Sequence, residues 1–132
     1  MLEIRQDARA SVSMGVTPAH TAKAVQSGSL EVFATPMMAA LMEKAACAAL
    51  APYLEGEETT VGTALAIRHT AATPVGMQVT AEAVVTAVNG REITFRVTAR
   101  DEAGEIGSGE HTRFVVYAGR FQEKAEQRGR HE

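Results

Sequence analysis

The stretch that most limits the possible folds is VFATPMMAALMEKAACAALAPYL, residues 32–54. Alanine, methionine and leucine dominate it and are strong helix formers, and Thr35-Pro36 is typical of a helix start, with the threonine as N-cap. Pro52 is expected to end the helix. At 100° per residue the apolar side chains leave almost no polar side, so we expect a helix that is buried all round. Other elements must therefore wrap around it.

Four later segments alternate between apolar and polar residues, as strands do. They are residues 61–69, 77–88, 91–100 and 105–117. Asn89-Gly90 is a strong hairpin signal, and the other connections are also short, so we expect these four strands to form an antiparallel meander. Residues 8–16 are expected to add an edge strand. The predicted fold class is α+β, with one curved antiparallel sheet wrapped around one long central helix.

The chain of 132 residues fits a single domain, with a core at about residues 8–118. Residues 17–31 are small and polar, and we expect an irregular connection with one helical turn that serves as a lid. Residues 119–132 interleave arginines with glutamates. We expect this charged tail to be a solvated, frayed end rather than a binding arm.

Composition argues against several classes of function. A net charge of −3 and a pI near 5.8 give no basic face for nucleic acid. The start MLEIRQDARASV lacks the pattern of a secretory signal, and Glu43 and Lys44 interrupt the only apolar run of membrane-spanning length. The four histidines show no metal-ligand spacing, and the single cysteine, Cys47, is expected to be a small core residue. We expect a cytoplasmic protein without a metal, nucleic acid or membrane partner.

The unusual residue of the predicted helix is Glu43, since a buried carboxyl has a raised pKa and rarely lacks a partner. Thr35 is one candidate partner, about 80° around the helix and roughly 12 Å along it. His69 is another, at the end of the otherwise apolar face of a strand. Each has a structural alternative: Thr35 as a plain N-cap, His69 as a core histidine, and Glu43 as a partly exposed residue paired with a lysine. Arg113 is either a surface residue or an anchor for a carboxylate.

The predicted order of elements resembles the hotdog fold, and several stretches resemble the fluoroacetyl-CoA thioesterase family within it. The similarity covers about residues 8–118, and HTAATPVG is its most specific part. The matching stretches are VFAT at 32–35, Glu43, PYLEGEE at 52–58, VGT and HTAATPVGM within 61–77, NGREITFRVTARD at 89–101 and IGSGEHTRFVV at 106–116.

The resemblance implies a set of functional residues and an assembly. It implies a catalytic set of Thr35, Glu43 and His69, a glycine near the substrate thioester at Gly62, and further substrate-binding or site-supporting residues at Phe33 and Arg113. It also implies a homodimer with the acyl-CoA site formed between two subunits, and it leaves open whether dimers pair into a tetramer. No cofactor is implied beyond the coenzyme A of the substrate.

These residue types suit thioester hydrolysis, which needs an activated nucleophile, a base and donors to the developing oxyanion. Glu43 can activate water or attack directly, His69 can shuttle a proton or polarise the carbonyl, and Thr35 can hydrogen-bond to either. The nucleophile stays open among Glu43, Thr35 and water.

The chain departs from the family in the lid. The family has aromatic residues before the VFAT stretch, whereas residues 24–31 read AVQSGSLE. We therefore expect a short or medium acyl group other than fluoroacetyl. Two alternatives remain, a non-catalytic acyl-CoA-binding module and a hotdog hydratase or dehydratase, and the HTAATPVG match favours the thioesterase over the latter.

Overall fold

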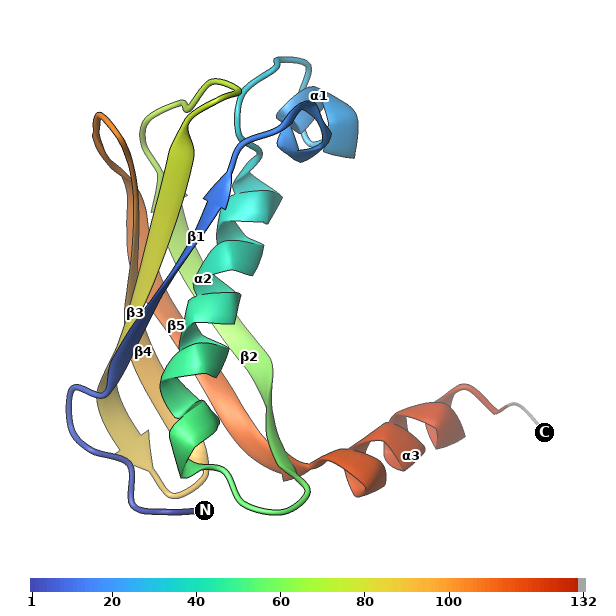
Figure 1. Ribbon diagram of the computed structural model, residues 1–132. Coiled ribbons are helices and arrows are strands. Elements are labelled where there is room, and N and C mark those ends of the chain that lie inside the picture. The colour runs from blue at the N-terminus through green and yellow to red at the C-terminus, as the bar shows by residue number, and fades with distance from the viewer. Residues whose placement is uncertain (131–132) are drawn as a thin grey trace.

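One antiparallel sheet curves around one long helix in the computed structural model, which describes residues 1–130 (Figure 1). The helix is α2 (Thr35–Leu50), and the short helix η2 (Ala51–Tyr53) follows it. The strands are β1 (Arg9–Gly15), β2 (Glu58–His69), β3 (Gln78–Asn89), β4 (Glu92–Asp101) and β5 (Gly104–Tyr117), in the spatial order β1-β3-β4-β5-β2. This is the predicted α+β hotdog architecture.

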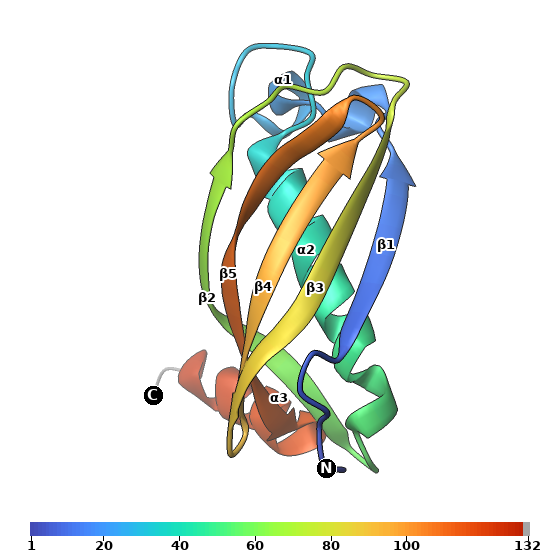
Figure 2. The same ribbon diagram turned by 90° about the vertical axis from the view of Figure 1, so that its left-hand side faces the viewer.

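Strand order differs from the prediction in one respect. Strands β3, β4 and β5 form a meander, and Gly90 turns the first hairpin with a φ of 63°, which glycine adopts without strain. Strand β2, however, pairs with β5 rather than with β3, and residues 70–77 carry the chain across the end of the sheet (Figure 2). The prediction of a four-strand meander is therefore wrong in placing β2 beside β3. An alternating pattern predicts a strand but not the strands that pair with it.

Helix α2 is buried on one side only. Seven of its residues face the sheet and are buried, namely Met38, Leu41, Met42, Ala45, Ala46, Ala49 and Leu50. The opposite stripe is exposed and includes Ala40, Lys44, Cys47 and Ala48. The predictions of a helix buried all round and of a core Cys47 are wrong for this chain, because the sheet covers one side of the helix and nothing within residues 1–130 covers the other.

Two further helical segments lie at opposite ends of the sheet. Residues 17–31 hold the short helices η1 (Pro18–His20) and α1 (Ala22–Val25) next to the start of α2 (Figure 1). At the other end of the molecule, residues Ala118–Arg128 form helix α3, so the prediction of a frayed tail is wrong there. No helix of residues 1–130 is long and apolar enough to cross a membrane.

Candidate active site

The start of α2 and the end of β2 bring Thr35 and His69 together. Thr35 is the first residue of α2, and its Oγ1 lies 2.8 Å from Nδ1 of His69, the last residue of β2. The N-cap is Ala34, which offers no side-chain cap, so the prediction of Thr35 as N-cap is wrong. The hydroxyl of Thr35 is therefore free to orient the imidazole.

The surroundings of His69 leave one ring nitrogen without a partner. The ring of Phe33, 1% exposed, meets the imidazole edge-on with centroids 6.5 Å apart. Nε2 of His69 is shielded from solvent and has no hydrogen-bond partner within residues 1–130. Burial lowers the pKa of His69, and the backbone of Ala71 opposes this more weakly. Buried polar atoms are nearly always hydrogen-bonded. Nε2 of a neutral His69 is therefore available to form a hydrogen bond with a bound ligand.

A cavity of about 280 Å³ opens beside this pair. Its lining comprises Ala22, Ser27, Val32, Phe33, Thr35, His69, Thr70, Ala71 and Ala72. Most of these side chains are small, and the described lining contains neither lysine nor arginine. Ala22 and Ser27 come from the segment predicted to be a lid, which thus forms one wall of the cavity.

A second cluster lies halfway along α2, where Glu43 binds Arg113. Arg113 Nη1 donates to Glu43 Oε2 at 3.2 Å, while Nε and Nη2 of the guanidinium donate to Oγ1 and the carbonyl of Thr60 at 2.9 and 3.0 Å. Arg113 is 6% exposed, so it anchors a carboxylate instead of lying on the surface. The Glu43 side chain is 43% exposed. The expectation of a buried Glu43 is therefore wrong in this chain, and its partner is an arginine rather than a lysine.

His111 belongs to the same cluster, although sequence reasoning missed it. It is 1% exposed, stacks on Phe95 with centroids 6.0 Å apart, and places Nε2 3.1 Å from Arg113 Nη1. A guanidinium can only donate, so Nε2 accepts and Nδ1 carries the proton that it donates to the carbonyl of Ala64 at 2.7 Å. Burial lowers the pKa of His111, the hydrogen bond to the Ala64 carbonyl opposes this less strongly, and the charges of Arg113 (lowering) and Glu43 (raising) have smaller effects. His111 is thus a neutral support for Arg113.

Gly62 gives the Glu43 carboxylate its space. A Cβ at this position would lie 2.7 Å from Glu43 Oε2 and 3.2 Å from Arg113 Nη1. The pairing of β2 with β5 shifts register between Gly62 and Ala64, and such bulges re-aim neighbouring side chains. Gly62 therefore adjoins the Glu43–Arg113 cluster, whereas Phe33 adjoins the Thr35–His69 pair.

The six predicted site residues thus fall into two groups, one at the start of α2 and one halfway along it. Thr35 and Glu43 are eight residues apart in α2, which places them roughly 12 Å apart along its axis. The structure joins Thr35 to His69 and Glu43 to Arg113, and no polar contact within residues 1–130 links the two groups. A single copy of the chain therefore does not bring Thr35, Glu43 and His69 together.

Comparisons with known proteins agree on the family. Residues 16–118 match the family described as FlK, fluoroacetyl-CoA-specific thioesterase. A fluoroacetyl-CoA thioesterase of Streptantibioticus cattleyicolor is 49% identical over 98 residues, 74% of this chain and 70% of that protein. A solved structure of the fluoroacetyl-CoA thioesterase FlK has a TM-score of 0.90 at 40% identity, covering 95% of this chain and 97% of that one.

A more distant structure shows the same architecture. A thioesterase superfamily member from Thermus thermophilus has a TM-score of 0.89 at 28% identity, covering 96% of this chain and 94% of that one. The family match spans α2 and strands β2 to β5, including both groups of site residues. The chain therefore belongs to the fluoroacetyl-CoA-specific thioesterase family of hotdog-fold proteins.

Proposed function

We propose that the protein is an acyl-CoA thioesterase that hydrolyses a short or medium acyl-CoA to the free acid and coenzyme A. The observation that carries the proposal is the Thr35–His69 pair, which leaves a shielded, unpaired ring nitrogen beside a cavity. Membership in a family of thioester hydrolases favours hydrolysis over the hydration of a double bond.

The active site is completed by a second copy of the chain. In the proposed homodimer, Glu43 of one copy faces the Thr35–His69 pair of the other. Three features support this assembly: the half-exposed carboxylate of Glu43, the exposed stripe of α2, and the outer edge of β2, which has no strand partner within residues 1–130. An open edge strand is a ready site for pairing with another chain.

In the proposed reaction, the Glu43 carboxylate takes a proton from water, and the resulting hydroxide attacks the thioester carbonyl. Nε2 of His69, in the tautomer that carries a proton there, donates to the developing oxyanion, and the Thr35 hydroxyl holds the ring by donating to Nδ1. The positive end of the α2 dipole favours the same negative charge. The tetrahedral intermediate then expels the thiolate of coenzyme A, which recovers the proton from Glu43.

The cavity supports a small acyl group. Its volume of about 280 Å³ includes the space for the thioester itself, and its walls are mostly alanine, serine and threonine. Residues 24–31, in the lid, contain no aromatic side chain that would clamp a two-carbon acyl group. A short acyl chain of more than two carbons is therefore our preferred substrate over fluoroacetyl.

The test is thiol release from a panel of acyl-CoAs, from acetyl to decanoyl with fluoroacetyl and phenylacetyl esters, by wild type and Glu43→Gln. Glutamine keeps an oxygen for Arg113 but removes the base, so we expect the variant to fold and to lose at least about 10²-fold in kcat. Thermal unfolding of both proteins is the control, because a buried guanidinium that loses its partner is destabilising. Equal hydrolysis by both would remove Glu43 from the mechanism.

The same panel of acyl-CoAs distinguishes hydrolysis from the alternative function, acyl-CoA binding without catalysis. A non-catalytic acyl-CoA-binding module would raise its unfolding temperature with acyl-CoA while releasing no thiol from any ester. That result would overturn the proposed hydrolysis.

A further inference from the structure

A second cavity, of about 190 Å³, lies at the opposite end of the molecule, between the end of β5 and helix α3. Its lining includes Arg91, Val115, Tyr117, Arg120, Phe121 and Lys124, and we call it the basic-aromatic groove. Two of its aromatic side chains are unusually exposed, Tyr117 at 42% and Phe121 at 45%. Three cations beside two exposed aromatic rings stand out on a chain whose net charge is −3.

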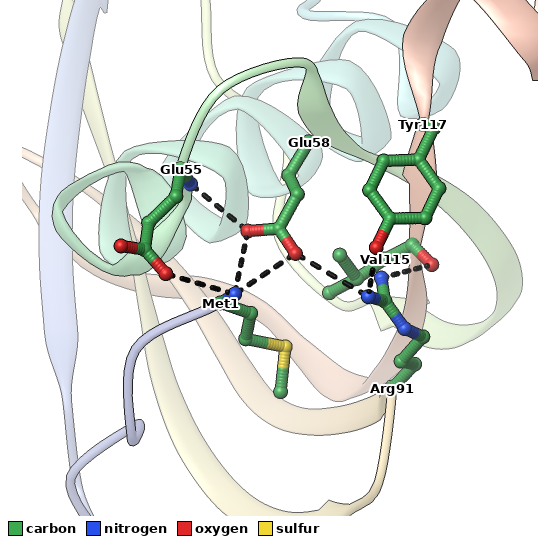
Figure 3. A network of polar contacts seen from close by, with 6 residues as sticks. All are labelled: Met1, Glu55, Glu58, Arg91, Val115 and Tyr117. Atoms are coloured by element: carbon green, nitrogen blue, oxygen red, sulfur yellow. Dashed lines mark hydrogen bonds and ion pairs between the residues drawn. The ribbon is translucent and has the colours of Figure 1, made fainter.

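One side of the basic-aromatic groove is held rigidly (Figure 3). Arg91 Nη2 donates to the Tyr117 hydroxyl at 2.8 Å and to Glu58 Oε2 at 3.4 Å, and its guanidinium carbon lies 4.9 Å from the centre of the Tyr117 ring. Glu58 also accepts from the amino group of Met1 at 2.9 Å. Glu58 therefore balances the charge of Arg91, which serves to orient the tyrosine.

The other side carries cations without acidic partners. Arg120 and Lys124 are four residues apart in α3 and so share one face of the helix, and neither forms an ion pair within residues 1–130. The Arg120 guanidinium lies 5.2 Å from the centre of the Tyr117 ring. Helix α3 has no buried residue, so this face is open.

We propose that the basic-aromatic groove binds the phosphorylated adenosine end of coenzyme A, an inference that rests on the proposed function. Arginine and lysine bind phosphate oxygens, and exposed aromatic rings stack on bases. The described lining of the catalytic cavity offers no lysine or arginine to pair with these phosphates. The phosphates of an acyl-CoA therefore need a second site, and this groove has the required chemistry.

The groove serves the catalytic cavity of the second copy. His69 ends β2 and Glu58 begins it, so the two cavities of one chain lie roughly 36 Å apart, farther than an extended pantetheine arm reaches. Antiparallel pairing of two open β2 edges would place the Glu58 end of one copy beside the His69 end of the other. One acyl-CoA would then lie across both copies.

The test compares an acyl-CoA with the same acyl ester of pantetheine, which lacks the nucleotide. The double variant Arg120→Glu/Lys124→Glu is expected to lower kcat/KM for the acyl-CoA by about 10-fold or more, because KM rises. Its kcat/KM for the pantetheine ester is expected to equal that of the wild type. Arg5→Glu/Arg9→Glu, two exposed residues of the β1 end, changes the net charge equally and is expected to match wild type on both esters. Added salt should shrink the difference between the two double variants, since it screens exposed charges.

Two results would overturn the proposal: equal kcat/KM of the wild type on the two esters, or equal losses by the two double variants on acyl-CoA. Calorimetric binding of adenosine 3′,5′-bisphosphate separates this proposal from the thioesterase itself. Wild type and Arg5→Glu/Arg9→Glu should bind this nucleotide, and Arg120→Glu/Lys124→Glu should not. If no ester is hydrolysed, that binding still supports the groove, and absence of binding to the wild type refutes it.

Discussion

The Thr35–His69 pair and the Glu43–Arg113 cluster each join a residue of α2 to a strand, but they are stabilised in opposite ways. The first is neutral, is held by one hydrogen bond of 2.8 Å, and keeps an unpaired ring nitrogen shielded from solvent. The second carries two charges, with an arginine 6% exposed that is fixed by four polar contacts and a carboxylate that is 43% exposed. The pair is thus suited to donate a hydrogen bond to a bound group, and the cluster to present a carboxylate in a fixed orientation.

The difference indicates what each group lacks. Within residues 1–130 the pair has a cavity but no carboxylate among its contacts, while the cluster has a carboxylate and lies roughly 12 Å farther along α2. The proposed mechanism requires both groups near one carbonyl carbon, and a two-fold dimer would present the same surface twice, so that each group completes the other across the proposed interface. The following predictions test these separate roles of the pair and the cluster, starting with the largest expected effect.

Removing the imidazole tests the pair directly. His69→Ala is expected to lower kcat by about 10²–10³-fold, the usual contribution of one hydrogen-bond donor to a developing oxyanion. Steady-state thiol release measures the effect, with His20→Ala as the control because His20 contacts Thr17 outside the pair. A loss below tenfold would return His69 to the role of a structural histidine.

Displacing the carboxylate tests the cluster. Gly62→Ala adds a Cβ that would lie 2.7 Å from Glu43 Oε2, so the carboxylate has to move. We expect kcat to fall by about 10–100-fold, since misplacement by an ångström can cost that much, with little change in the free energy of unfolding. Gly129→Ala is the matched control, because its Cβ would have only a 3.5 Å contact. Wild-type kcat in Gly62→Ala would show that the position of Glu43 is unimportant.

The support beneath Arg113 should have a smaller effect on rate and a clear effect on stability. His111→Asn can keep the donor to Ala64 but loses the acceptor for Arg113, whereas His111→Gln can supply an acceptor at the position of Nε2. We expect Asn to lower kcat about tenfold and the free energy of unfolding by about 1–3 kcal/mol, and Gln to recover most of the rate. Equal kcat in the two variants would show that His111 only fills space.

A change of pH is the mildest perturbation, and it acts on one histidine in each group. Burial lowers the pKa of His69 below the ordinary 6.5, so the acid limb of kcat/KM is expected below pH 6.5. His111 is shifted in the same direction. The unfolded chain then binds more protons below pH 6.5, so the free energy of unfolding is greatest above that pH and falls as the pH drops toward the folded values. Denaturant unfolding from pH 5 to 8 checks this, and stability that increases below pH 6.5 would contradict it.

Regular periodicity predicted the strands and their buried faces well. In β4, Ile93, Phe95, Val97 and Ala99 alternate with polar residues, and all four are buried. In β2 the single-face pattern did not hold, because the bulge between Gly62 and Ala64 shifts the register. The pairing of β2 with β5 also could not be predicted from the sequence, since an alternating pattern carries no information about which strands lie next to each other.

The site residues were easier to find than their surroundings. Thr35 before a proline is typical of a cap, and only the folded chain shows its hydroxyl on His69 instead. A helical wheel indicates that Glu43 has apolar neighbours but not where the sheet ends, so the sequence left a buried and a partly exposed Glu43 both open. His111 shares the parity of Arg113 on β5, which was the available signal, but its other partner, Ala64, is 47 residues away.

The most direct test of the two-copy site mixes two inactive variants, Glu43→Gln and His69→Ala, after dissociating and reassociating the subunits. If each site combines Glu43 of one copy with Thr35 and His69 of the other, half of the dimers are mixed and each has one intact site, so roughly a quarter of wild-type activity should return. If both groups act within one chain, every site lacks one residue and the mixture should stay as inactive as its components.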